Sequence, residues 1–193
     1  MEKNEHLLGT RRFLPMFVTQ FFGALNDNVY KQALLLVITY GWINQQSTDV
    51  STLNNLAALL FILPYFIFSA TAGQIADKYE RSQLVRGIKI LEIVIMLIAA
   101  WGFSSSNVNV QVPVLLGCTF LMGLHSTLFG PVKFAYLPQA LSERELTGGN
   151  GMVEMGTFVA ILLGNIAGGL LVAIPQVGPQ YVAVGCVVLA LLG

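Results

Sequence analysis

The sequence has few charged residues and no run of basic residues. Only 10% of its 193 residues are Asp, Glu, Lys or Arg, whereas 55% are hydrophobic, and the mean hydropathy is +0.70. Soluble domains carry roughly 25% charged residues, so this chain has too little polar surface to cover a globule in water. Without a basic tract, nothing indicates nucleic-acid binding. The composition therefore predicts an all-α integral membrane protein.

Cysteine and the usual catalytic motifs are also scarce. The two cysteines, Cys118 and Cys186, lie in apolar segments without metal-ligating neighbours, so we interpret both as packing residues and predict no metal site. The GGNG at 148–151 is not followed by GK[ST], as a phosphate loop would require. Because the chain shows no nucleophile paired with a base, we predict neither an enzyme nor a bound cofactor.

Long apolar segments predict a bundle of transmembrane helices. About 20 mainly apolar residues are needed to cross the hydrocarbon core. The predicted helices are 13–40, 53–75, 84–103, 112–135, 150–174 and 180–193. The last is only about 21 Å long at 1.5 Å per residue, short of the ~30 Å core. We therefore expect residues 1–193 to form one six-helix bundle whose sixth helix is truncated, within a longer protein.

Basic residues are unevenly distributed between the connections. The connections without any Lys or Arg are 41–52, 104–111 and 175–179. The N-terminus and the connections 76–86 and 136–149 do contain basic residues. Cytoplasmic loops of membrane proteins are enriched in Lys and Arg, so we predict a cytoplasmic N-terminus. Tyr40, Trp42 and Trp101 lie at the opposite helix ends, where an aromatic belt is expected.

The first predicted helix carries polar residues in the middle of an apolar run. They are Asn26, Asp27, Asn28, Lys31 and Gln32, with Gln20 two turns earlier. Gln20, Asp27 and Lys31 fall within a sector of about 40° on a helix. A charge at the bilayer centre costs roughly 2.5–3.5 kcal/mol, so such a stripe faces protein or water. Either Asp27 and Lys31 neutralise each other and join helices, or, as the extra amides favour, the stripe lines a substrate path.

Other charged residues are candidates for the same cavity. We place Glu92 and Glu154 in the first turns of their helices on the cytoplasmic side. Glu92 either pairs locally with Lys89, three residues earlier, or acts as a cavity carboxylate or proton acceptor. Glu154 either stabilises the N-terminus of its helix through its negative charge or lines the cavity. Lys133 either extends to the headgroup level or binds an anion, and His125 is interpreted as a hydrogen-bonded interior residue.

The fifth predicted helix carries a stripe of small residues. Gly156, Ala160, Gly164 and Gly168 recur at four-residue spacing. Small residues on one face allow a neighbouring helix backbone to approach closely. The stripe therefore indicates a helix-packing surface, and the alternative is a surface that also permits sliding during a conformational change.

Residues 73–85, GQIADKYERSQLV, resemble the signature loop between the second and third helices of the major facilitator superfamily. Gly73, Asp77 and Arg81 stand at signature positions, with Ile75 and Lys78 as near equivalents, whereas Glu80 replaces a glycine and Ser82 a basic residue. The resemblance implies a conformational gate. In the superfamily the aspartate latches against a helix of a second bundle, which these 193 residues do not contain.

A closer resemblance, over almost the whole chain, is to the lysophospholipid transporter branch of this superfamily. It is carried by QFFGALNDNVYKQAL, by Lys89 and Glu92, by LFGPVKFAYLP and by GNGMVEMGT. This resemblance implies the N-terminal half of a 12-helix transporter. It also implies a fused or associated acyltransferase and acyl-carrier-protein synthetase as partners. GNIAGG at 164–169 has Asn165 where an antiporter motif has proline, so no antiporter is implied.

The resulting expectation is a transporter or flippase of lysophospholipid in a Gram-negative inner membrane, working by rocking of two bundles. In it, Asp27 would bind an ammonium group, and Lys31 or Lys133 a phosphate. One alternative is a small-solute symporter with Asp27 as its proton or sodium site. Another is a non-transporting membrane module of a fused acyltransferase. In all three cases membrane lipids are partners and nucleic acid is not.

Overall fold

The computed structural model describes residues 7–42, 50–105 and 107–193, and this part of the chain is helical apart from short connections. The helices are α1 (Leu14–Leu36), α2 (Val50–Lys78), α3 (Arg81–Ser104), α4 (Val108–Ala140), α5 (Glu143–Val172) and α6 (Gly178–Leu192). A short 3-10 turn, η1 (Leu7–Gly9), precedes α1, and a π-helical segment, η2 (Val37–Trp42), continues it. No strand occurs among the described residues, so the all-α prediction is confirmed.

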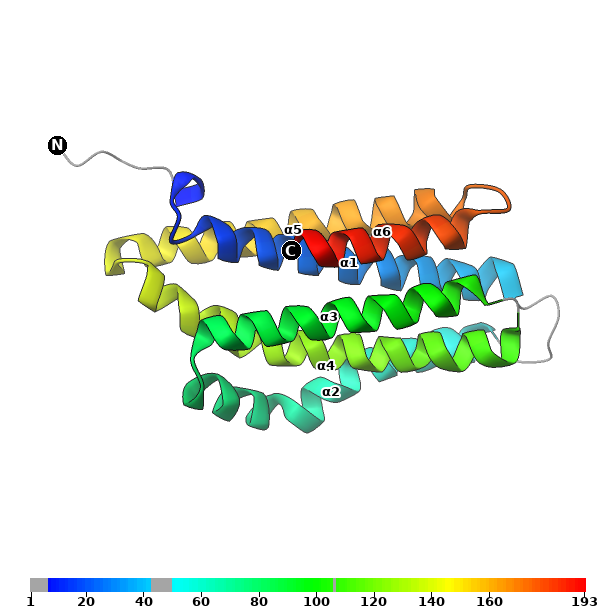
Figure 1. The fold of residues 1–193 in the computed structure, drawn as a ribbon, viewed down its shortest axis with the longest axis horizontal. Coiled ribbons are helices and arrows are strands. Elements are labelled where there is room, and N and C mark those ends of the chain that lie inside the picture. The colour runs from blue at the N-terminus through cyan, green and yellow to red at the C-terminus, as the bar shows by residue number, and fades with distance from the viewer. Residues whose placement is uncertain (1–6, 43–49, 106) are drawn as a thin grey trace.

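The six helices lie side by side in two groups (Figure 1). One group contains α1, α5 and α6, in which α1 packs mainly against α5. The other contains α2, α3 and α4, in which α2 packs mainly against α4. Packing of α3 against α6 joins the groups. Residues of α1, α3, α4 and α6 form the largest buried apolar cluster, which includes Cys118 and Cys186 as free thiols.

Tyr30 shows how this cluster tolerates a polar atom. Its side chain is fully buried, and its hydroxyl donates a hydrogen bond to the Leu115 carbonyl at 2.5 Å. The ring of Phe103 meets it edge-on, with ring centroids 5.8 Å apart. A buried Tyr hydroxyl needs such a partner because an unmade hydrogen bond is costly in an apolar interior. Tyr30 therefore links α1 to α4 in the core.

The small-residue stripe of α5 faces α1 at very short range. A Cβ atom on Gly164 would lie 2.7 Å from the Leu25 carbonyl oxygen, and one on Gly168 would lie 2.6 Å from that of Val29. Ala160, one turn before Gly164, is fully buried. Only glycine permits this separation, because side-chain carbon and main-chain oxygen do not approach so closely. The stripe thus places α1 directly on α5.

The helices extend beyond the predicted boundaries, most clearly between α4 and α5. The predicted connection 136–149 is helical except at Leu141 and Ser142. Ser142 and Glu145 form a capping box at the start of α5, so the helix begins seven residues before the predicted start at 150. The glycines at 148–151 are therefore inside the helix. Lys3, most of the connection 41–52 and the side chain of Trp42 lie outside the described residues.

Three described helices are long and apolar enough to cross a membrane by themselves. They are α2, residues 109–140 of α4, and α5, while α6 is apolar but shorter. By contrast, α1 carries Asp27 and Lys31 within its length, and α3 carries Lys89 and Glu92. These two less apolar helices are the ones whose charged side chains meet inside the bundle.

Candidate functional site

Charged side chains from several helices meet in one pocket, which we call the polar pocket. Its volume is about 220 Å³, and it is lined by residues of α1 to α5. The ionisable groups in its wall are Asp27, Lys89, Glu92, His125 and Lys133, with Tyr65 of α2 opposite. Two carboxylates and two ammonium groups thus share a cavity that also has apolar walls. Such a site suits a ligand that carries both signs of charge.

Asp27 reaches this pocket from α1. Its Oδ2 accepts a hydrogen bond from Ser126 Oγ of α4 at 2.7 Å. Its Oδ1 is buried and has no hydrogen-bond partner among the described residues. Because a buried carboxylate oxygen is costly to leave unpaired, this atom is an acceptor available to a ligand.

Glu92 is the centre of a charged cluster. The side chain is fully buried, and Lys89 Nζ lies 2.6 Å from Oε2 while Asn26 Nδ2 donates to Oε1 at 2.9 Å. The predicted Lys89–Glu92 pair is present. Glu92 was predicted to lie in the first turns of its helix, but α3 begins at Arg81. It lies three turns further, in the interior.

His125 of α4 completes the cluster. It is 4% exposed, and its Nε2 lies 3.3 Å from Glu92 Oε2. Its interior position is as predicted, but neither ring nitrogen has the geometry of a hydrogen bond to a described residue. The ring stacks on Phe129 at a centroid distance of 6.3 Å. His125 also has a charged neighbour that the sequence did not indicate, because Glu92 is 33 positions away on another helix.

Lys133 and Glu154 form a looser pair. Lys133 Nζ lies 3.4 Å from Glu154 Oε1 and 4.6 Å from the centroid of the Phe134 ring. The Glu154 side chain is 46% exposed, so this pair is partly in solvent or headgroups. Because α5 begins at Glu143, Glu154 is three turns inside it and does not act on a helix N-terminus. Lys133 lines the polar pocket, and Glu154 does not.

Two amides of the α1 stripe make hydrogen bonds of different kinds, one to α5 and one within α1 itself. Gln20 Nε2 donates to the Val153 carbonyl at 2.8 Å and to Thr157 Oγ1 at 3.0 Å, at the edge of the polar pocket. Asn28 Nδ2 donates to the Ala24 carbonyl of its own helix at 2.7 Å. Asn28 does not line the polar pocket. The polar residues of α1 therefore diverge towards different helices.

Lys31 lies in a second pocket, which we call the apolar pocket. This pocket, of about 250 Å³, lies between α1 and α2, and its polar residues are Lys31, Asn54 and Thr119. Lys31 Nζ sits 4.2 Å from the centroid of the Phe61 ring, a cation–π contact. Within the described chain no carboxylate lies within 4.0 Å of Lys31 Nζ. The interpretation that Asp27 and Lys31 neutralise each other directly is therefore wrong.

The predicted gate residues lie where α2 ends and α3 begins. They are Gly73, Asp77, Lys78 and Arg81. Asp77 is exposed and makes no hydrogen bond or ion pair to another described residue. Glu80, which departs from the motif, caps α3. Hydrogen bonds from the Ser82 hydroxyl and from the Gln83 and Ser82 main-chain amides lower the pKa of Glu80 below its ordinary value.

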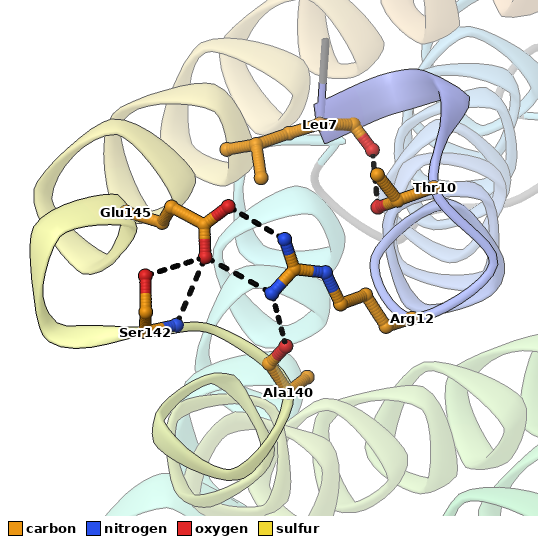
Figure 2. A network of polar contacts seen from close by, with 6 residues as sticks. All are labelled: Leu7, Thr10, Arg12, Ala140, Ser142 and Glu145. Carbon is orange, nitrogen blue, oxygen red and sulfur yellow. Dashed lines mark hydrogen bonds and ion pairs between the residues drawn. The ribbon is translucent and has the colours of Figure 1, made fainter. Parts of the chain in front are cut away.

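A polar network at the start of α1 was not predicted from the sequence, and we call it the Arg12 clasp. Figure 2 shows the Arg12 guanidinium facing Glu145, with Nη2–Oε1 and Nη1–Oε2 distances of 2.6 and 3.0 Å. Glu145 also caps Ser142, and Arg12 Nη1 donates to the Ala140 carbonyl at 3.5 Å. The S-x-x-E spacing of Ser142 and Glu145 was a readable capping signal. Nothing in the sequence linked Arg12 to it.

Comparison with known proteins identifies the family. A model of the Major Facilitator Superfamily matches residues 16–193. The chain belongs to the major facilitator superfamily. It is 29% identical over 163 residues to proteins named lysophospholipid transporter LplT from Yersinia enterocolitica and Serratia proteamaculans. The match covers 84% of this chain but only 36% and 37% of those relatives, so the chain spans little more than a third of their length. No solved structure matches it.

Proposed function

We propose that this chain is one six-helix bundle of a transporter that moves lysophospholipid across the inner membrane of a Gram-negative bacterium. The observation that carries the proposal is the polar pocket, which holds both signs of charge inside a membrane helix bundle. Membership of the major facilitator superfamily supports transport as the activity. The printed name of the relatives supports lysophospholipid as the substrate.

The chemistry of the pocket suits the head of a lysophospholipid. The unpaired Oδ1 of Asp27 can accept a hydrogen bond from a ligand ammonium. Lys31 and Lys133 are the candidates for binding a phosphate as a point charge. Lys133 is loosely paired, with its Nζ 3.4 Å from Glu154 Oε1. Lys31 makes no ion pair with a described residue. Lys89 and Glu92, by contrast, hold each other at 2.6 Å. We assign that pair to shaping the pocket and Asp27 to the ligand.

The proposed mechanism is alternating access. All six helices would span the membrane, with the N-terminus in the cytoplasm as the basic residues indicate. A second bundle would face the polar pocket, and rocking of the two bundles would expose it to either side. The exposed Asp77 would latch on that second bundle in one of the two states. An acyltransferase and an acyl-carrier-protein synthetase, fused or associated, would consume the imported lysophospholipid.

Uptake into proteoliposomes tests the proposal. We expect the natural gene product to take up lysophosphatidylethanolamine without an ion gradient. Asp27→Asn is expected to reduce uptake by about tenfold, because a neutral amide loses the charge-assisted hydrogen bond. Glu143→Gln removes an exposed carboxylate at the start of α5 and serves as the matched control, with unchanged uptake. Wild-type protein that moves no lysophospholipid would contradict the proposal.

The unpaired Oδ1 of Asp27, beside Ser126, also favours a second candidate. In a small-solute symporter this carboxylate would be the proton or sodium site. Uptake of a soluble solute that requires an ion gradient and is abolished by Asp27→Asn would favour it. Lysophospholipid uptake by protein free of any acyltransferase would contradict the hypothesis of a non-transporting module.

A further inference from the structure

The apolar pocket contains a lysine that makes no ion pair with a described residue. Lys31 projects from α1, and its Nζ lies over the face of Phe61, 4.2 Å from the ring centroid. None of the ion pairs in the described part of the chain involves Lys31. The aromatic ring stabilises the ammonium charge less than a carboxylate would, since a cation–π contact is weaker than a charge-assisted hydrogen bond. The ammonium of Lys31 is thus free to bind an anionic group that enters the pocket.

Asn54 of α2 adds an unpaired acceptor to the same pocket. The Thr39 hydroxyl donates to the Leu35 carbonyl at 2.7 Å, so its oxygen is left to accept from Asn54 Nδ2 at 3.1 Å. This chain of bonds fixes the amide orientation, because Thr39 cannot also donate to Asn54. The Asn54 Oδ1 therefore faces away from Thr39, and it is buried without a hydrogen-bond partner among the described residues. Because Asn54 lines the pocket, an occupant with a hydrogen-bond donor can satisfy this oxygen.

Apart from Thr119, whose hydroxyl donates to the Leu115 carbonyl at 2.9 Å, the rest of the pocket is apolar and reaches the surface of the bundle. Leu34, Ala57 and Ala58 form its wall with Phe61. Ile62, which is 49% exposed, and Leu35, which is 44% exposed, stand at its edge. An alkyl chain fits such a wall. The occupant thus needs an alkyl chain, an anionic group and a hydrogen-bond donor close together.

The two pockets occupy successive turns of the same helices. Asp27 of the polar pocket and Lys31 of the apolar pocket are four residues apart on α1, about 6 Å along the axis. Tyr65 and Phe61 are related in the same way on α2. An ammonium at Asp27 and a phosphate at Lys31 are therefore within reach of one phosphoethanolamine group.

We propose that the apolar pocket is a binding subsite for the glycerol backbone and the first part of the acyl chain of a single-chain phospholipid. Lys31 binds a phosphate oxygen, and Asn54 Oδ1 accepts a hydrogen bond from the free glycerol hydroxyl. This hydroxyl exists only because the second acyl chain is missing. Asn54 is therefore a specificity-determining residue that distinguishes single-chain from two-chain lipids. The inference rests on the proposed function and deepens it.

Competition against uptake of labelled lysophosphatidylethanolamine tests the assignment in the natural gene product. The competitors are unlabelled lysophosphatidylethanolamine, its analogue without the glycerol hydroxyl, and a free fatty acid. For wild-type protein we expect the deoxy analogue to compete about fivefold to tenfold more weakly than the hydroxyl form. The fatty acid, which has neither phosphate nor glycerol hydroxyl, is expected to compete more weakly than both.

The variants then assign the discrimination to residues. Asn54→Val is expected to bring the hydroxyl-to-deoxy ratio close to one, whereas Asn55→Val, on the exposed side of the same helix turn, retains the wild-type ratio. Lys31→Met is expected to weaken both lipids alike by about tenfold, and Lys31→Arg to retain binding. A ratio measured within one variant does not depend on how much of that variant folds.

The outcomes separate the subsite from the transport function. A wild-type protein that transports but does not discriminate, or an Asn54→Val variant that keeps the wild-type ratio, overturns the subsite and leaves the transporter standing. Fatty acid competing as well as lysophospholipid would also overturn it, because the pocket would then recognise any anionic alkyl chain. A wild-type protein without lysophospholipid uptake overturns the proposed function and the subsite together.

Discussion

The polar pocket and the apolar pocket lie on the same helix, but their charges are arranged differently. In the polar pocket, Glu92 is surrounded by Lys89 at 2.6 Å, Asn26 at 2.9 Å and His125 at 3.3 Å. In the apolar pocket, Lys31 Nζ lies over an aromatic ring and makes no ion pair with a described residue. Buried charges that are paired are costly to separate, whereas a charge without an ion pair is available to a ligand.

The difference separates structural from ligand-facing roles within one polar stripe. Removing a charge from the charged cluster around Glu92 should destabilise the fold, because its partners would remain buried and unpaired. Changing the apolar pocket should damage binding and leave folding almost unchanged. Four experiments, in decreasing order of expected effect, test this difference in roles.

The largest effect is expected for Lys89→Met, which leaves the buried Glu92 without its closest cation. Breaking a buried ion pair costs about 3–5 kcal/mol of unfolding free energy, and the partial exposure of Lys89 places the effect near the lower limit. Unfolding in mixed detergent micelles measures it. The double variant Lys89→Met/Glu92→Gln should recover most of the loss. Equal instability of single and double variants would show that the pair is not structural.

Gly164→Ala is expected to cost about 1–3 kcal/mol, because the new Cβ would meet the Leu25 carbonyl oxygen and push α1 off α5. The measurement is again the unfolding free energy. The matched control on the same helix is Gly151→Ala, where a Cβ would meet nothing within 4 Å. The control should stabilise slightly through its higher helix propensity. Similar effects at both positions would contradict a fixed α1 behind the two pockets.

Ala58→Leu fills part of the apolar pocket with a larger side chain. We expect lysophospholipid affinity to fall by about tenfold, while the unfolding free energy changes by no more than about 0.5 kcal/mol. Competition assays and unfolding of the same preparation give both numbers. Ala70→Leu, at an exposed position of α2, is the control for added bulk. A large loss of stability at Ala58 would mean that the pocket is closed in the working protein.

The smallest effect is expected for Glu80, a charged residue outside the membrane helices. Because the folded protein lowers its pKa, the carboxylate contributes stability above its ordinary pKa of 4.5, and this contribution is lost as the pH falls below that value. Glu80→Gln should therefore speed amide exchange at Ser82 and Gln83 at pH 7. The difference between variant and wild type should shrink as the pH falls through the lowered pKa, because the wild-type carboxyl then becomes neutral. A difference in exchange that appears only at low pH would contradict the capping role.

The helices could be predicted from the sequence, but some of their ends could not. Apolar length located all six segments, because crossing or filling an apolar core demands it. The start of α5 was predicted at 150, whereas the capping box of Ser142 and Glu145 starts the helix at Glu143, ahead of the glycines at 148–151. Local capping outweighed the glycines, whose cost inside a helix is only about 1 kcal/mol each.

The candidate site could be predicted only in part. The polar face of α1 and the Lys89–Glu92 pair were readable, because helical periodicity and short spacing determine them. The roles of His125 and Asn54 were not, since each depends on side chains from other helices. The Arg12 clasp was missed for the same reason, as Arg12 and Glu145 are 133 positions apart.

The sequence by itself determined that this protein is helical, apolar and built around a few interior charges, because composition and periodicity act within each helix. Only the tertiary structure decided which of those charges are paired. On one helix, Gln20 meets α5, Asp27 meets α4 and Lys31 meets Phe61 of α2. A sector of about 40° on a helix cannot distinguish these neighbours, since several helices pack around α1 and each offers different partners.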